Sequence, residues 1–84
     1  MPAVASERAA RILEARLEHL AAAAERSTTT GQTLLRRRIE LARGATSHAI
    51  ALALLSDAEA RAIWANAVRR HPALAQLGVS ARGA

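Results

Sequence analysis

Residues 31–55 constrain the fold more than any other part of the chain. Their first half places leucines and alanines at the three- and four-residue spacing of an amphipathic helix, with arginines between them. Residues 49–55 lose that amphipathicity, because their apolar side chains would point in every direction around a helix. A helix that is apolar on all sides must be buried on all sides. We therefore expect one long helix over residues 31–55, with an end that needs cover from several neighbours.

A helix is also expected over residues 6–26. Ser6 is a good N-cap, and the carboxylate of Glu7 suits the positive end of the helix dipole. An apolar stripe follows at helical spacing, made of Ala10, Leu13, Leu17, Leu20 and Ala24. An acidic stripe runs beside it, made of Glu7, Glu14, Glu18 and Glu25. Residues 1–5 are expected to form a short frayed tail.

The connection between these helices is short and rich in Ser and Thr. Such residues favour helix caps over helix interiors. Thr29, with Gln32 three residues later, matches a capping box for the second helix. A connection of this length predicts that the two helices fold back on each other as an antiparallel hairpin.

The second helix is expected to bury one face against the first. The predicted apolar arc consists of Leu34, Leu35, Leu41, Ala42, Ala45 and Ala49. Arg38 falls within this arc by helical geometry, whereas Arg36 and Glu40 lie opposite it at the spacing of a weak i,i+4 ion pair. Gly44 costs about 1 kcal/mol relative to alanine in mid-helix. A kink, a close helix crossing and a tolerated weak point remain open as explanations for it.

The clearest local signal begins a third helix over residues 57–71. Ser56 and Glu59 match a capping box. The apolar face of this helix consists of Ala60, Ile63, Trp64, Ala67 and Val68. Pro72 ends the helix at the residue before it and begins a further single turn, which Gly78 closes. Residues 78–84 are expected to form a loose tail.

These patterns predict an all-α fold in a single domain over residues 1–84. An antiparallel helical hairpin and a third, shorter helix form a three-helix bundle. The large apolar residues are few: eleven Leu, four Ile, three Val, one Trp and one Met. A domain of this size is marginally stable unless packing is good or a partner helps. We therefore expect a homodimer to complete the bundle, through assembly and core residues Ile50, Leu52, Leu54, Leu55, Ile63 and Trp64.

The net charge of +5 comes entirely from arginine, because the chain has no lysine. Codon usage in a GC-rich genome accounts for such a bias, yet the resulting positive field favours acidic partners, nucleic acid or anionic lipid. The candidate partner-binding residues are Arg36, Arg37 and Arg43 on the second helix and Arg61, Arg69 and Arg70 on the third. Two internal roles compete with partner binding.

The first internal role pairs arginines of the second helix with the acidic stripe of the first. In an antiparallel hairpin, Glu14, Glu18 and Glu25 would run past Arg43, Arg38 and Arg36. The second places Arg69, Arg70 and His71 at the negative end of the third helix's dipole. Trp64 is expected to be a core or interface anchor, because tryptophan is usually buried to a large extent.

Several function classes find no support in the sequence. There is no cysteine, and therefore no thiolate nucleophile and no disulfide. His19, His48 and His71 lack the spacing of metal ligands, and no glycine-rich phosphate loop is present. We therefore expect no enzyme activity, no cofactor and no metal. The longest apolar run is far short of the roughly 20 residues that span a bilayer, which predicts a cytoplasmic protein.

The leading hypothesis is a small non-enzymatic regulatory protein that docks on a macromolecular partner. A protein is the favoured class of partner. An accessory or inhibitor protein of a mobile element would have these features. The alternative is nucleic-acid binding through the arginine-rich surface, with steep salt dependence. A DNA-reading helix-turn-helix over residues 49–70 is disfavoured, because Asp57 and Glu59 would repel phosphate. Binding at a membrane surface is a third hypothesis, against which the acidic stripe argues.

Overall fold

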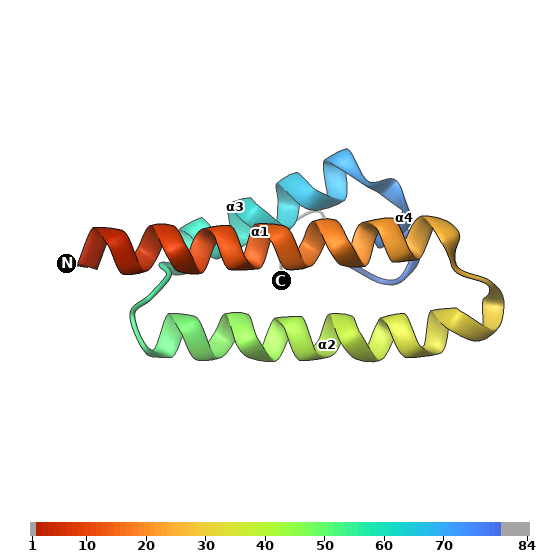
Figure 1. Ribbon diagram of the computed structural model, residues 1–84, viewed down its shortest axis with the longest axis horizontal. Helices are drawn as coiled ribbons and strands as arrows, with labels where there is room; N and C mark the ends of the chain where they lie inside the picture. Colours follow the sequence, from red (N-terminus) through yellow and green to blue (C-terminus); the bar gives the residue numbers. More distant parts are fainter. Residues whose placement is uncertain (1, 80–84) are drawn as a thin grey trace.

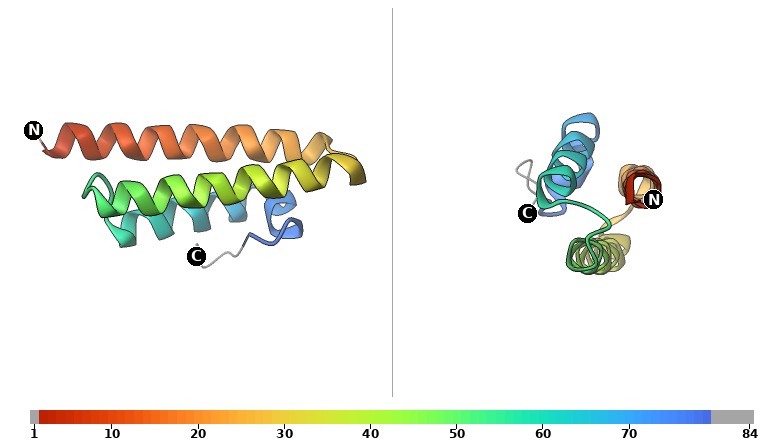
Figure 2. Two further views of the ribbon diagram at one scale, coloured as in Figure 1. Left: turned by 90° about the horizontal axis from the view of Figure 1, so that it is seen from below. Right: turned by 90° about the vertical axis from the view of Figure 1, so that its left-hand side faces the viewer.

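The structure is a computed structural model that describes the backbone of residues 2–79 and the side chains of residues 6–28 and 31–79. Its described part is all-α, as expected, with helices α1 (Pro2–Arg26), α2 (Thr29–Ala51), α3 (Asp57–Arg70) and α4 (Pro72–Gln76). Figure 1 shows α1 and α2 as a long antiparallel hairpin, and Figure 2 shows α3 and α4 together along one side of it. The molecule is elongated, with extents of 43 × 20 × 18 Å.

Helix α1 begins earlier than the sequence indicated. It starts at Pro2, so Ser6 is not an N-cap and residues 2–5 are not a frayed tail; Met1 lies outside the described residues. Proline is suited to the first turn of a helix, and the alanines that follow it are strong helix formers. The long helix packs against α2, α3 and α4. It is therefore a central helix of the bundle.

Helix α2 is shifted toward the N-terminus relative to the expected range. Its N-cap is Thr28, whose Oγ1 accepts a hydrogen bond from the Gly31 N–H at 3.4 Å. The predicted capping box on Thr29 and Gln32 is therefore wrong: the N-cap lies one residue earlier, and Gly31 has no side chain to complete a box. The helix ends at Ala51 instead of Leu55. The choice among four consecutive cap-forming residues could not be made from the local pattern, because each of them favours a helix N-terminus.

The C-terminal end of α2 closes with a Schellman motif. The Ala53 N–H donates to the Ile50 carbonyl at 3.0 Å, and the Leu54 N–H donates to the Ala49 carbonyl at 2.9 Å. Ala53 has a φ of 60°, in the left-handed region that glycine usually occupies at this position. The helix therefore stops in the middle of the apolar run.

Residues 49–55 consequently do not form a helix that is buried on all sides, and that expectation is wrong. Leu55 is 4% exposed and belongs to the core, whereas Leu52 is 57% exposed. Ile50 and Leu54 are half-buried. The turn sends these side chains in different directions, so the protein's own chain covers most of them without a fully enclosed helix.

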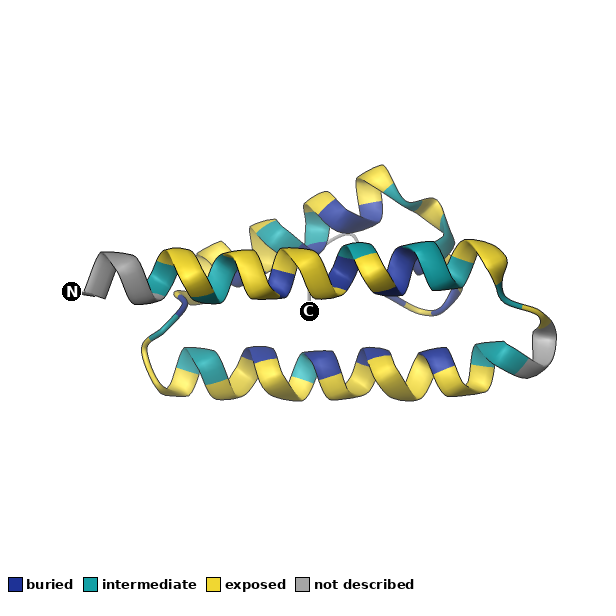
Figure 3. Cartoon of the chain, viewed as in Figure 1, coloured by how far each residue is buried: buried dark blue, intermediate teal, exposed yellow. Residues whose placement is uncertain are grey.

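The core runs along the centre of the bundle (Figure 3). Its largest members are Leu13, Leu17, Leu20, Leu35, Ile39, Leu55, Trp64, Val68, Leu74, Leu77 and Val79. The predicted stripe of α1 is confirmed for its leucines, and Ala10 and Ala24 pack partly buried against it. The apolar face predicted for the third helix is also confirmed, with Ile63 half-buried.

The buried face of α2 differs from the predicted arc. Leu35 and Ala42 are buried as expected, but they share that face with Ile39 and Thr46. These four positions follow the i, i+4, i+7, i+11 spacing of a single helical stripe. The predicted stripe was rotated relative to the real one, so Leu34 and Leu41 are 54% and 66% exposed. Arg38 is exposed for the same reason, and the expectation that it points into the core arc is wrong.

The end of the chain is better ordered than expected as far as the structure describes it. Helix α4 is the predicted single turn, and Gly78 closes it with a φ of 90°. The Gly78 N–H donates to the Ala75 carbonyl at 3.0 Å, and the Val79 N–H donates to the Leu74 carbonyl at 3.2 Å. Val79 is 3% exposed, so the predicted loose tail is wrong for residues 78 and 79. Residues 80–84 lie outside the described part.

Helix α3 begins as predicted. The Glu59 N–H donates to Ser56 Oγ at 3.0 Å, and the Ser56 N–H donates to Glu59 Oε1 at 3.2 Å. This reciprocal capping box fixes the start of the helix at Asp57. The last helical residue is Arg70, one residue before the predicted end.

Candidate docking face

The six arginines predicted to bind a partner do not form one patch. Arg36 and Arg37 are exposed on α2, and Arg69 is exposed near the end of α3. Arg61 forms an ion pair with Asp57 within α3, with Nε and Oδ2 2.9 Å apart. Arg70 pairs with Glu18 of α1. The positive charges are therefore distributed over several sides of the bundle, and half of the six have acidic neighbours.

The side chain of Arg43, a residue of α2, contacts α3 and the C-terminal segment. Its guanidinium carbon lies 5.8 Å from the centroid of the Trp64 ring, a cation–π arrangement. Its Nη2 donates to the Gly78 carbonyl at 3.4 Å, and its Nη1 donates to Glu40 Oε1 at 3.3 Å. The side chain is thus engaged within the fold.

Trp64 was predicted to be a core or an interface anchor, and the structure places it in the core. It is 3% exposed. Its Nε1 donates to Thr46 Oγ1 at 3.2 Å, and that hydroxyl donates to the Ala42 carbonyl at 2.8 Å. This chain satisfies the buried indole N–H and joins α3 to α2 at a place where the two helices make few other contacts.

The acidic stripe of α1 faces α3 and α4 instead of α2. Glu18 accepts from Arg70 and lies 2.9 Å from His71 Nε2, and Glu25 Oε1 lies 3.4 Å from His71 Nδ1. Within the described residues, the predicted ion pairs between this stripe and Arg36, Arg38 and Arg43 are not formed. Glu40 pairs with Arg43, and the predicted Arg36–Glu40 pair is likewise absent from the described part. The acidic residues therefore neutralise the α3 side of α1 and leave its other side basic.

The large exposed apolar side chains gather on the side of the hairpin that α3 and α4 leave open. Among residues 6–28 and 31–79 they are Ile12, Leu34, Leu41 and Leu52, each more than half exposed. Ile12 and Leu41 line hollows along the seam between α1 and α2. Leu34 and Leu52 lie on the same side of α2 as Leu41, because their spacings of seven and eleven residues are close to whole turns. This side therefore carries an unpartnered apolar stripe.

Two hollows follow one another along this seam. One of about 190 Å³ contains Ala9, Ile12, Arg16, Ala45 and Leu54 among its lining residues. The other, of about 380 Å³, is lined by Arg16, His19, Leu20, Arg38 and Leu41. Arg16 lines both, so the two hollows adjoin at this residue, and we call them together the α1–α2 groove. No carboxylate lines either hollow.

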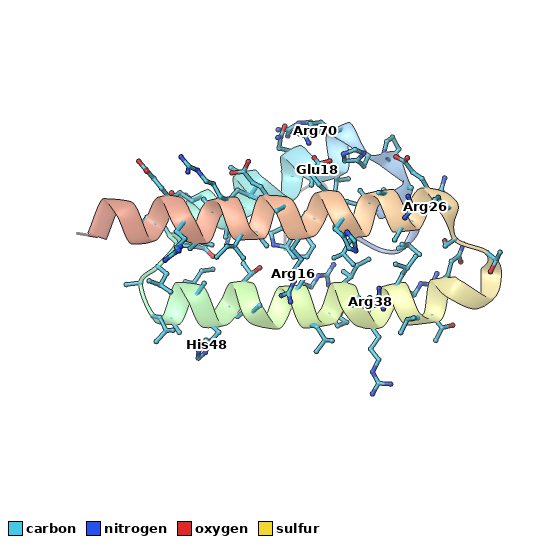
Figure 4. All side chains as sticks on the ribbon, in the orientation of Figure 1. Arg16, Glu18, Arg26, Arg38, His48 and Arg70 are labelled. Atoms are coloured by element: carbon cyan, nitrogen blue, oxygen red, sulfur yellow. The ribbon has the colours of Figure 1, made fainter. Side chains whose placement is uncertain are left out.

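The α1–α2 groove combines an apolar floor with basic side chains. Figure 4 shows Arg16 and Arg38 beside the seam between the two helices, whereas Glu18 and Arg70 lie together on the other side of α1. Both arginines of the groove are exposed, and the ion pairs of the described residues do not include them. A groove of this composition can hold an apolar side chain and an acidic group at the same time.

Sequence reasoning missed this groove. It assigned Leu34 and Leu41 to the core and left Ile12 and Arg16 without a role. One signal was available, since α2 carries more apolar residues than a single helical stripe can hold. Such a helix has apolar side chains beyond those that its contacts with α1 and α3 bury.

The predicted assembly residues fall into three groups. Leu55 and Trp64 are core residues, Ile50 and Ile63 are half-buried against the core, and Leu54 is half-buried. Only Leu52 among the six is largely exposed. The sequence argument for a dimer relied on a fully apolar helix, and that helix is absent.

Other kinds of site find little support in the geometry. Across the described part of the chain, no three His, Asp or Glu side chains are placed to hold a metal ion. None of the helices within residues 2–79 is long and apolar enough to cross a membrane. A hollow between α1 and α3 contains Glu14, Glu18, Arg69 and Arg70, so its charges largely offset each other.

Comparison with known proteins gives no family assignment. No protein-family model matches the sequence, and neither a curated protein nor a solved structure is significantly similar to it. The functional argument therefore depends on the physical features of this chain.

Proposed function

We propose that this protein is a small binding protein that docks on a macromolecular partner through the α1–α2 groove. The observation that carries the proposal is the gathering of Ile12, Leu34, Leu41 and Leu52, the large exposed apolar residues, on one side of the hairpin. Contiguous exposed apolar surface with a polar rim is typical of interaction sites in soluble proteins.

The groove has the parts that a protein interface needs. Exposed leucine and isoleucine side chains supply apolar area, which contributes about 25 cal/mol per Å² on burial. Arg16 and Arg38 supply charged donors beside that area, and arginine is enriched in interfaces. Both helices that form the groove contribute large side chains to the core, such as Leu17 of α1 and Leu35 of α2, so the site is pre-organised and its binding costs little ordering entropy.

Nucleic-acid binding through the six arginines first singled out is the less supported function. Arg43, Arg61 and Arg70 are engaged by groups within the protein, and of the other three, Arg36 and Arg37 lie on α2 and Arg69 lies on α3. Phosphate binding along a duplex needs several free basic groups on one surface.

Site-specific photo-crosslinking tests the proposal. Leu41 is replaced with benzoylphenylalanine, and the full-length protein is irradiated in an extract of its native host. The matched control carries the same group at Arg36, which is exposed on the same helix but does not line the groove. The expected result is a protein adduct from position 41 that is absent at position 36. The assignment is checked by competition, since excess unlabelled wild type removes the adduct and excess Leu41→Glu does not.

Other adducts would contradict the proposal in different ways. A nucleic-acid adduct from position 41 would favour the alternative function. An adduct of twice the protein's own mass would make the groove a self-association surface and support a homodimer, although through residues other than most of those first predicted. Equal adducts from both positions, or none from position 41, would mean that the groove is not a docking site.

A further inference from the structure

We infer that the α1–α2 groove receives an acidic amphipathic helix of a partner protein. This inference rests on the proposed function and names the kind of partner that the groove fits. It is carried by the charges along the groove, by its shape and by the spacing of its apolar residues.

The charges select an acidic partner. Arg16, His19 and Arg38 line the groove, and carboxylates are absent from both of its hollows. The carboxylates of α1 that could have neutralised this side, Glu18 and Glu25, are directed to Arg70 and His71 on the other side of the helix. The groove therefore has a positive field that an acidic partner would complement.

The shape selects a helix. Two antiparallel helices with a depression along their seam form a floor into which a further helix can pack by ridges-into-grooves contacts. The apolar stripe from Leu34 to Leu52 is matched by a partner helix of about 18 residues, about 27 Å long. Apolar anchors at i, i+3 or i+4 and i+7 would contact Leu41 and Ile12, and flanking carboxylates would reach Arg16 and Arg38.

A second copy of the chain is a poorer occupant. A two-fold symmetric contact would place the groove of one copy on the groove of the other. Arg16 and Arg38 would then face the same two residues of the other copy, and like charges across an interface are unfavourable. A nucleic acid would meet the exposed Ile12 and Leu41 side chains beside the two arginines, and these apolar side chains offer phosphate no hydrogen-bond donor.

Selection from a displayed library of helical peptides tests the inference and does not require the natural partner to be identified. The library has about 18 residues with apolar and charged positions randomised, and the full-length protein is the bait. The expected outcome is enrichment of peptides with apolar residues at helical spacing and a net negative charge. Binding of the selected peptides, measured by fluorescence anisotropy, is expected to weaken at least about tenfold in the Arg16→Glu/Arg38→Glu double variant.

The matched control is the Arg11→Glu/Arg36→Glu double variant. It changes the net charge equally on the same two helices, at exposed residues that do not line the groove. It is expected to bind the selected peptides within about twofold of wild type. Circular dichroism and Trp64 fluorescence verify that each variant is folded. Equal weakening in both double variants would show a non-specific charge effect and overturn the inference.

The failure of the inference is distinguishable from failure of the proposed function. Enrichment of basic or neutral helices, or of no helix, would overturn the acidic-helix partner. If the photo-crosslink from position 41 still identified a protein, docking through the groove would stand. Light scattering during size-exclusion chromatography completes the test, because a dimer that Leu41→Glu dissociates would identify a second copy as the occupant.

Discussion

Replacing Ala53 with glycine is expected to stabilise the protein, although it removes a side chain and makes no new contact. Ala53 has a φ of 60° at the end of α2. The left-handed conformation costs an L-residue roughly 1–2 kcal/mol. Glycine avoids that cost, but it gives the unfolded chain greater conformational freedom, which lowers the free energy of unfolding by about 0.5–1 kcal/mol. The methyl group of Ala53 is exposed, so its removal leaves no cavity. With the middle value of each range, the net gain should be about 0.75 kcal/mol, and about 0.5–1 kcal/mol is the expected interval around it.

Thermal and urea unfolding measure this gain. For a domain of this size, 1 kcal/mol shifts the melting temperature by about 4–8 °C, so Ala53→Gly should melt about 2–8 °C higher. Circular dichroism follows the helices. Trp64, the one tryptophan of the chain and a buried one, gives an independent signal by fluorescence. The two signals should give coincident transitions if unfolding is two-state.

Two control variants separate backbone conformation from the composition change. Ala15→Gly makes the same replacement at an exposed position inside α1, where it should destabilise by about 1 kcal/mol. Gly78→Ala makes the reverse change at a φ of 90° with open space around the new methyl group, and it should also destabilise, by about 1 kcal/mol or more. A loss of stability in Ala53→Gly similar to that in Ala15→Gly would refute the reasoning.

Three further tests, with five substitutions in all, probe the core, the surface and a helix cap. Thr46→Val removes the oxygen that accepts from Trp64 Nε1 and should cost about 1–3 kcal/mol in urea unfolding, whereas Thr46→Ser, which keeps the hydroxyl, should cost less. Leu17→Ala should cost about 2–5 kcal/mol because Leu17 is 1% exposed, and Leu41→Ala should stay within about 0.5 kcal/mol of wild type; equal effects would contradict the assignment of Leu41 to the surface. Ser56→Ala should cost about 1 kcal/mol, measured by the same unfolding curves, and an unchanged stability would mean that the capping box contributes nothing.

The sequence by itself determined the helices and most of their ends. The capping box of Ser56 and Glu59, the stop before Pro72 and the turn at Gly78 are formed by residues close together in the chain. Such signals act through local hydrogen bonds and backbone preferences, so they do not depend on the rest of the fold. The leucine stripe of α1 was also predictable, because one regular stripe leaves one choice of buried face.

Local sequence signals did not predict the two ends of α2 correctly. Thr28 and Thr29 are both acceptable caps, and the choice of Thr28 sets the start of α2. At the other end of the helix, Ala53 adopts a conformation that its own preference opposes. The burial of Leu55 in the core is a tertiary gain that outweighs this local cost.

Only the tertiary structure decided which side of α2 is buried and which is open. Helix α2 carries two apolar stripes, and its contact with α1 buries the one containing Ile39 and leaves the one containing Leu41 exposed. Side-chain spacing fixes the angle between two stripes on a helix but not the rotation of that helix against its neighbour. That rotation is set by packing with α1 and by the Thr46–Trp64 hydrogen bond to α3. The same rotation leaves Arg38 beside Arg16 and thereby forms the α1–α2 groove.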